Sequence, residues 1–220
     1  LKEAQEEDDK TGLSRCYNIM SQIYTIKRFD SMAFEWRLKE IELTEKYKIE
    51  NYNISQTYAQ IANYYINQKK QKEALAAVEK AIATANSSTQ QISAKLEFVN
   101  YYSKFGDFQA AEKLLKECQA AFEQDKRLES IKKRLYNIEC LYYQQTKQYP
   151  KALEAAKMQE KEERRLSESI LSSSHYRTQG EIYQKMGNMN LAVKYLQMYI
   201  NTDDSLKIAN EQVASSEFAT

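Results

Sequence analysis

A register of tyrosines and alanines recurs five times along the 220-residue chain. In each copy a tyrosine stands nine residues before an alanine, and successive alanines are 41, 37, 41 and 40 residues apart. A fixed register at this spacing is typical of a chain built from stacked copies of one small structural unit. The tyrosines are Tyr24, Tyr65, Tyr102, Tyr143 and Tyr183, and the alanines are Ala33, Ala74, Ala111, Ala152 and Ala192.

A second position extends the register, because a small or compact residue precedes each repeat tyrosine by three residues. One small residue on each of two antiparallel helices lets their backbones approach closely, and the tyrosine ring fills the wider gap beside the crossing. The pattern therefore predicts antiparallel helix pairs. It also suggests that Tyr64, Tyr101 and Tyr142, each directly before a repeat tyrosine, lie between neighbouring repeats. The compact residues are Ser21, Ala62, Val99, Cys140 and Gly180.

The order of small residue, tyrosine, turn, alanine and apolar residue resembles the tetratricopeptide repeat (TPR) over nearly the whole chain. The match is best in the last copy, at Tyr176, Gly180, Tyr183, Gly187, Asn188, Ala192 and Leu196. This resemblance implies an all-α fold, a right-handed TPR-like superhelix of about five antiparallel helix pairs plus a C-terminal capping helix. Armadillo and HEAT arrays have repeats of about 40 to 47 residues and fit the length. The tyrosine and alanine register favours the TPR instead.

Composition and turn residues set the expected boundaries. Only 4 glycines and 1 proline occur, as long helices with short turns require. Gly106-Asp107 and Gly187-Asn188 each combine a helix stop with a cap for the next helix, and Pro150 suits a first turn. Thr11-Gly12 is interpreted as a turn before the first repeat. We expect one array over residues 1–220, with repeats at about 13–48, 52–86, 89–124, 127–164 and 167–201 and a terminal helix at 203–220.

Charge and reactive residues argue against several classes of function. With 32 basic and 31 acidic residues the net charge is +1, so no overall field favours nucleic acid or an anionic membrane. The mean hydropathy is −0.75, and no apolar run spans a bilayer. Three scattered cysteines and one histidine make no zinc motif, and no nucleophile has an identifiable base. We therefore predict a non-enzymatic protein without cofactor or metal, and without direct contact to nucleic acid or membrane.

A binding surface is expected on the first helices of the pairs, which line the concave side of a helical array. The polar positions one and two turns from the packed ones are rich in carboxamides, with a few cations. Carboxamides bond peptide backbone groups and Arg or Lys holds carboxylates, so the predicted ligand is an extended peptide or protein segment. The positions are Arg15, Asn18, Gln22, Gln56, Asn63, Asn67, Asn100, Lys104, Arg134, Asn137, Gln144, Arg177, Glu181, Gln184 and Lys185.

The segment from Tyr199 through Asp203-Asp204-Ser205-Leu206 to Phe218 resembles the end of TPR sensor regions in Bacteroidetes-type signal-transduction proteins. In that group a transmembrane helix and a histidine kinase or helix-turn-helix output domain commonly follow. The resemblance implies a bacterial, periplasmic ligand-sensing region, and the chain is interpreted as a piece of a longer protein. The alternatives are a cytoplasmic scaffold or adaptor for protein assembly and an accessory domain tethered to an enzyme.

Overall fold

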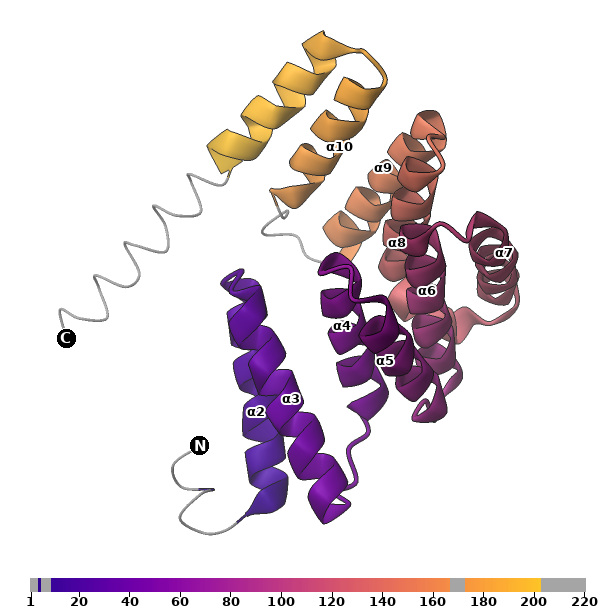
Figure 1. Cartoon of the computed structure of the whole chain (residues 1–220). Helices are drawn as coiled ribbons and strands as arrows, with labels where there is room; N and C mark the ends of the chain where they lie inside the picture. Colours follow the sequence, from indigo (N-terminus) through magenta and orange to yellow (C-terminus); the bar gives the residue numbers. More distant parts are fainter. Residues whose placement is uncertain (1–3, 5–8, 167–172, 203–220) are drawn as a thin grey trace, which may run out of the picture. The chain divides into compact units, whose positions relative to one another are not determined.

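The computed structural model describes residue 4 and residues 9–166 and 173–202, and their regular structure is entirely helical (Figure 1). No strand occurs in this described part of the chain. A final helix, residues 189–202, follows the labelled elements and is called the last helix below. The labelled elements are α2 (Lys10–Ile26), α3 (Asp30–Tyr47), α4 (Ile54–Asn67), α5 (Gln71–Ala83), α6 (Ser88–Phe105), α7 (Phe108–Gln124), the 3₁₀ helix η1 (Lys126–Ile131), α8 (Lys132–Gln145), α9 (Tyr149–Leu166) and α10 (Ser174–Lys185).

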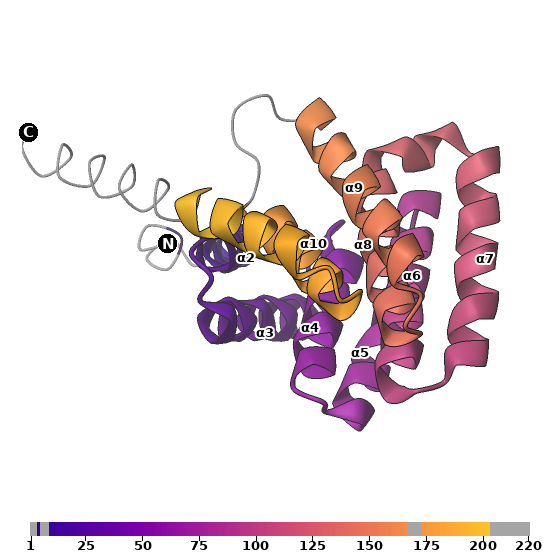
Figure 2. The same cartoon turned by 90° about the horizontal axis from the view of Figure 1, so that it is seen from above.

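The chain divides into two compact units, the N-terminal unit Leu1–Glu129 and the C-terminal unit Ser130–Thr220. In the N-terminal unit α2 packs on α3, α4 on α5 and α6 on α7, and α3 with α4 and α5 with α6 join one pair to the next. In the C-terminal unit α8 pairs with α9, and α9 also packs on α10. Figure 2 shows the helices of both units from above. An all-α, TPR-like arrangement of helix pairs is thus confirmed, whereas one continuous array over residues 1–220 stays a prediction.

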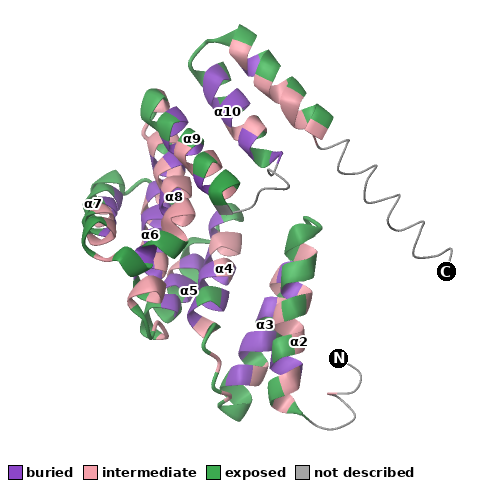
Figure 3. Cartoon of the chain, turned by 180° about the vertical axis from the view of Figure 1, so that it is seen from behind, coloured by how far each residue is buried: buried purple, intermediate pink, exposed green. Residues whose placement is uncertain are grey.

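The compact residues of the register meet where the helices cross. All five compact residues and all five repeat alanines are buried. The repeat tyrosines are buried at Tyr183 and half-buried in the other four copies, as expected of rings that cover a crossing. Figure 3 shows the buried residues in purple. One core cluster joins α4 and α5 and includes Ala62, Ala74 and Val78. The residues that recur in the sequence are therefore residues that pack in the cores of the helix pairs.

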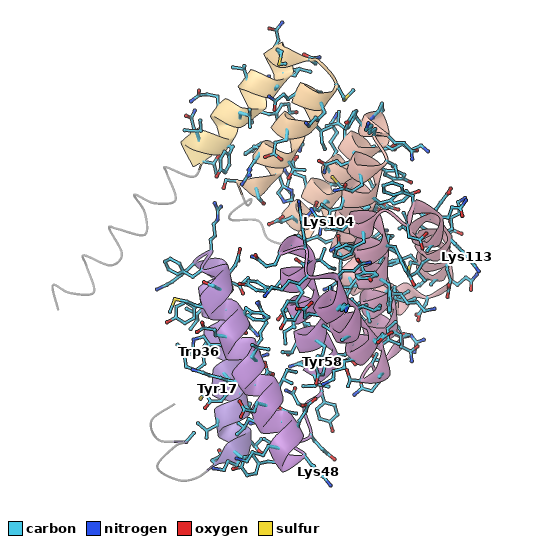
Figure 4. All side chains as sticks on the ribbon, viewed as in Figure 1. Tyr17, Trp36, Lys48, Tyr58, Lys104 and Lys113 are labelled. Carbon is cyan, nitrogen blue, oxygen red and sulfur yellow. The ribbon has the colours of Figure 1, made fainter. Side chains whose placement is uncertain are left out.

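Aromatic rings connect the helices of the N-terminal unit. Tyr17 on α2 packs against Trp36 on α3 with ring centroids 5.4 Å apart (Figure 4). Phe34 on α3 stacks on Tyr64 of α4, with centroids 4.0 Å apart and the planes 15° from parallel. Tyr101 of α6 belongs to the cluster that α4 and α5 form. The expected position between neighbouring repeats is thus confirmed for Tyr64 and Tyr101.

Most predicted turn residues act as expected. Gly106 has φ +90°, and the Asp107 side chain then accepts a hydrogen bond from the Ala110 N–H. Gly187 has φ +77°, and Asn188 caps the last helix in the same way. These left-handed conformations favour glycine because it has no Cβ.

The prediction of a turn at Thr11-Gly12 is wrong. Helix α2 begins at Lys10, and Asp9 caps it by accepting a hydrogen bond from the Gly12 N–H at 2.9 Å. An aspartate at this position satisfies an exposed amide of the first turn, so the helix continues through the glycine. The expected start of the fifth repeat at residue 167 and the terminal helix at 203–220 lie outside the described residues.

Candidate peptide-binding surface

A pocket of about 340 Å³ opens between α2 and the connection from α3 to α4. Arg15, Asn18 and Ile19 of α2 line one side, and Asn51, Tyr52 and Asn53 of the connection line another. Arg15 and Asn18 are three residues apart on one helix, which places them on the same face. Two of the predicted binding residues therefore lie in a pocket that the sequence did not reveal.

A buried carboxylate forms part of the pocket lining. Glu40 of α3 is 1% exposed and accepts hydrogen bonds from the side-chain amides of Asn18, at 3.3 and 3.2 Å, and of Asn51, at 2.8 Å. The Thr57 hydroxyl of α4 adds a contact of 3.3 Å. A buried charge needs such partners to offset its lost hydration. Glu40 thus ties α2, the connection and α4 together.

Further hydrogen bonds orient the two asparagines. The Gln22 side-chain amide donates to Asn18 Oδ1 at 2.6 Å, and the Asn53 backbone N–H donates to Asn51 Oδ1 at 2.9 Å. Each carboxamide is thereby held at both its amide and its carbonyl ends. Side chains fixed in this way lose less conformational entropy when a ligand binds.

Basic side chains outnumber acidic ones in the hollow beside the pocket, where Lys10, Arg15 and Lys48 lie with one carboxylate, that of Glu50. This shallower hollow of about 630 Å³ shares Arg15 and Tyr52 with the pocket and adds Lys10, Tyr47 and Lys48. The Lys10 ammonium lies 5.1 Å from the centre of the Tyr47 ring. Lys48 ends α3 (Figure 4). The region therefore offers several positive charges and exposed aromatic rings beside the fixed carboxamides.

Arg37 lies one turn before Glu40 on α3 and is also buried. Its guanidinium donates to Gln60 at 2.8 Å and to the Thr25 hydroxyl at 2.6 Å. Burial lowers the pKa of Arg37 below its usual range, and the charges of Asp30 and Glu40 oppose that shift. An arginine keeps its charge even so. The Glu40 carboxylate is thus partly neutralised from inside the protein.

The asparagines of α4 and α6 converge on a second buried carboxylate. The side-chain amides of Asn63 and Asn100 donate to the Glu97 carboxylate at 3.5 and 3.4 Å. The Asn67 side-chain amide donates to Asn63 Oδ1 at 2.9 Å. Asn100 is only 8% exposed, and its role as a groove-lining residue stays a prediction. It faces inward because Glu97 lies one turn earlier on α6 and is itself buried. Gln56 and Lys104 are exposed.

The remaining predicted binding residues belong to the C-terminal unit. Arg177 and Glu181 pair with each other at 2.8 Å on α10, and Gln144 donates to the Cys140 sulfur at 3.3 Å. Arg134, Asn137 and Gln144 are half-buried on α8, whereas Gln184 and Lys185 are exposed on α10. The structure therefore brings together the predicted residues of α2, and separately Asn63, Asn67 and Asn100 of α4 and α6.

Sequence reasoning missed Glu40, Asn51, Tyr52 and Asn53. Glu40 was overlooked because a glutamate on a second helix is usually solvated. The alternation of asparagine and tyrosine in the connection was the available signal, since such residues bond nearby backbone groups in turns.

The buried thiols offer no nucleophile at neutral pH. Burial raises the pKa of Cys118 to about 12 and that of Cys140 to about 11. A thiol must lose its proton to act as a nucleophile. Within residues 9–166 and 173–202, no group of histidine, cysteine and carboxylate side chains could hold a metal ion. None of the helices described there is long and apolar enough to cross a membrane.

Comparisons with known proteins support the fold alone. No protein-family model and no characterised protein matches the sequence. Among solved structures, BtubC (BKLC) from P. vanneervenii is 14% identical, with 94% of this chain and 87% of that chain covered and a TM-score of 0.55. PilF of Pseudomonas aeruginosa is 15% identical, with coverages of 88% and 78% and a TM-score of 0.50. A putative kinesin light chain of Podosopora anserina with TPR-like repeats is also similar, at 15% identity, coverages of 87% and 95% and a TM-score of 0.45.

Proposed function

We propose that this chain is a non-enzymatic module that binds an extended peptide or protein segment at the pocket beside α2. The observation that carries the proposal is the pair of asparagines, Asn18 and Asn51, that the buried Glu40 holds in place at the pocket. Fixed carboxamides suit the N–H and C=O groups of a peptide backbone. The TPR-like fold supports the proposal, because such helical arrays present extended binding surfaces.

The ligand class follows from the charges around the pocket. Arg15 is exposed at the lining, and no ion pair joins it to a carboxylate within the described residues. Lys10 and Lys48 line the adjoining hollow. An arginine can hold a carboxylate through two parallel hydrogen bonds. We therefore expect the bound segment to carry an acidic side chain or its C-terminal carboxylate close to Arg15.

A direct test selects peptides from a random peptide library on the full chain and measures their affinity by fluorescence anisotropy. Arg15→Ala should weaken binding about tenfold, as expected for loss of one charged anchor. Lys113→Ala, an exposed cation on α7, serves as the matched control and should leave affinity unchanged. If no peptide is enriched, or if Arg15→Ala binds the selected peptides as well as the parent, the proposal is wrong.

The biological setting that we propose is the periplasmic ligand-sensing region of a bacterial signal-transduction protein. Its support is the resemblance of residues 199–218 to TPR sensor regions. A ligand could signal only by binding one conformation of the chain more tightly than another. Sequencing the gene on both sides of this region tests the setting. A secretory leader upstream and an apolar span with an output domain downstream are expected, and a stop codon directly after Thr220 would contradict it.

A scaffold or adaptor for protein assembly is the second candidate. The observation that favours it is a row of exposed apolar side chains on α2, at Ile19, Ile23 and Ile26. Exposed apolar rows of this kind mark protein-interaction sites more often than small-ligand sites. Stoichiometric co-purification of a folded protein, with no peptide selected from the library, would favour the scaffold over the peptide-binding module.

A further inference from the structure

The residue directly before each repeat tyrosine reveals an uncovered face on α2. In the last four copies this position is half-buried at Tyr64 and buried at Tyr101, Tyr142 and Ile182. In the first copy it is Ile23, which is 40% exposed. A large, mostly apolar side chain at this position is therefore buried or half-buried in the later copies and exposed to solvent on α2.

Two more positions of the register show the same difference. Eight residues before the tyrosine, Thr57, Ala94, Leu135 and His175 are buried, whereas Cys16 of α2 is half-buried. Five residues before the tyrosine, α2 has Ile19, which is 55% exposed. These three positions lie on one face of a helix, because they are separated by three and four residues. We call Cys16, Ile19 and Ile23 the incoming face.

Between the first two pairs, α3, the second helix of the preceding pair, covers the corresponding face of α4. On α4, Tyr64 stacks on Phe34 of α3, Gln60 accepts a hydrogen bond from Arg37, and Thr57 donates to Glu40. The covering residues lie one, four and seven positions after the repeat alanine, Ala33. On α10, His175 is bonded to Glu163 of α9, which lies outside this register of one, four and seven positions.

The last helix presents the other half of that interface. The positions one, four and seven after its repeat alanine are Val193, Leu196 and Tyr199, which we call the outgoing face. Val193 is 66% exposed, and Leu196 and Tyr199 are half-buried. On α3 and α5 the fourth and seventh positions are buried. The nearby Ile200 is also exposed, at 48%.

We propose that the chain associates with copies of itself head to tail, with the outgoing face of one copy on the incoming face of the next. The two faces correspond to the two halves of the interface that α3 and α4 form, so a second copy supplies a helix of the required register. By analogy with α3 and α4, Val193 would lie opposite Ile23, and Leu196 opposite Ile19. The positions that hold Arg37 and Gln60 in the interface of α3 and α4 are occupied by Leu196 and Ile19 at the two ends of the chain. Both residues are apolar, so burial of apolar surface provides the driving force for association.

Such an interface joins different surfaces of two identical chains, so it leaves one free face at each end of the product. Association should therefore continue beyond a dimer as the concentration rises. Analytical ultracentrifugation of the full chain from about 1 μM to about 1 mM, the range of weak protein contacts, measures this directly. We expect the mean mass to rise steadily over this range.

Single charged substitutions at the two faces provide the decisive experiment. Ile23→Glu blocks the incoming face and Val193→Glu blocks the outgoing face, and each variant alone should be monomeric. Mixed in equal amounts, the two variants should form a dimer and nothing larger, because each contributes one intact face. Phe108→Glu, at an equally exposed apolar position on α7, should associate like the parent chain.

Circular dichroism melting of each variant shows that it is folded, and the high exposure of both positions predicts little change. A parent chain that stays monomeric at every concentration would overturn the proposal. So would a mixture of the two variants that stays monomeric, or association that Ile23→Glu abolishes and Val193→Glu does not affect.

Discussion

Two glutamates, Glu40 and Glu97, lie inside the N-terminal unit where a repeat protein would ordinarily place apolar residues. Each accepts hydrogen bonds from asparagine side chains of a neighbouring helix. A buried carboxylate loses hydration energy that only such hydrogen-bond partners offset. Removing either the glutamate or its asparagine partners therefore lowers the free energy of unfolding. At the residue scale, these polar contacts determine which faces of neighbouring helices pack together. The compact residues determine how closely the backbones of paired helices approach.

Replacing Glu40 by glutamine should destabilise the fold. Gln keeps the shape but turns one acceptor into a donor, which then faces the donors of Asn18, Asn51 and Thr57. We expect a loss of about 1 to 3 kcal/mol in the free energy of unfolding, measured by urea denaturation. Glu42→Gln, an exposed position on the same helix, is the control and should change little. Equal midpoints for both variants would show that the buried network contributes nothing.

Enlarging a repeat alanine tests the packing register. Ala74 is fully buried at the crossing of α4 and α5, so Ala74→Leu must displace its neighbours. The expected cost is about 1 to 3 kcal/mol, seen as a lower denaturation midpoint. Ala76→Leu, exposed on the same helix, should leave the midpoint nearly unchanged. A stable Ala74→Leu protein would mean that the crossing lies elsewhere.

At the scale of helices, the pair formed by α10 and the last helix depends on one close approach. A Cβ added at Gly180 would lie 2.8 Å from the Leu196 Cγ and 3.3 Å from the Leu196 backbone nitrogen. The side chain can move, whereas the backbone nitrogen moves only with its helix. An alanine here would therefore require the Leu196 side chain to move and its backbone to shift by a few tenths of an ångström.

Gly180→Ala separates this contact from helix propensity. In an open helix the change stabilises by up to about 1 kcal/mol, because alanine loses less backbone entropy than glycine. Here we expect net destabilisation, seen as faster amide hydrogen exchange in the last helix, with exchange in α4 and α5 unchanged. Slower exchange in the last helix would contradict the close approach.

A charged contact between helices makes the C-terminal unit sensitive to acid. Glu163 of α9 bonds to Lys133 of α8 at 3.1 Å and to His175 of α10. Burial raises the pKa of Glu163, but these hydrogen bonds and charges outweigh it, and the net pKa lies below the ordinary 4.5. A carboxylate with a lowered pKa in the folded state stabilises above its unfolded pKa, and this contribution is lost as the pH falls through the folded value.

The stability of the C-terminal unit should therefore decrease as the pH falls below about 4.5. Urea denaturation followed at several pH values measures the effect, and Glu163→Gln should flatten this part of the pH profile. Glu154→Gln, exposed on the same helix, should retain the profile of the parent chain. An unchanged slope in Glu163→Gln would show that another group is responsible.

On the scale of the whole molecule, each helix pair is stabilised by its own contacts and by those with its neighbours. The cluster centred on α4 and α5 has a pair on either side along the chain, since α3 and α6 both contact it. Within the described residues no further pair stands before α2 or after the last helix, and both helices expose apolar side chains. Local stability should therefore be highest in the middle of the N-terminal unit and lowest at the two ends.

Hydrogen exchange measured by mass spectrometry tests this order. We expect the slowest exchange in α4, α5 and α6, and faster exchange in α2 and the last helix, because terminal repeats open without breaking the rest. Raising the protein concentration should slow exchange in α2 and the last helix if copies associate, while α4 serves as an internal control. Uniform exchange along the chain would instead indicate a single cooperative unit.

The sequence by itself determined the helix pairs, their crossing residues and most of their turns. The register of Tyr65 and Ala74 is visible because packing within a pair repeats with the same spacing, and Gly106 marks its turn through local backbone conformation. The tertiary structure alone decided which polar residues stay open for a ligand. Asn18 donates to Glu40 of α3 and Asn63 donates to Glu97 of α6, through contacts between helices that no local period encodes. The uncovered face of α2 also became visible only when burial was compared between copies, because exposure depends on which neighbour is present.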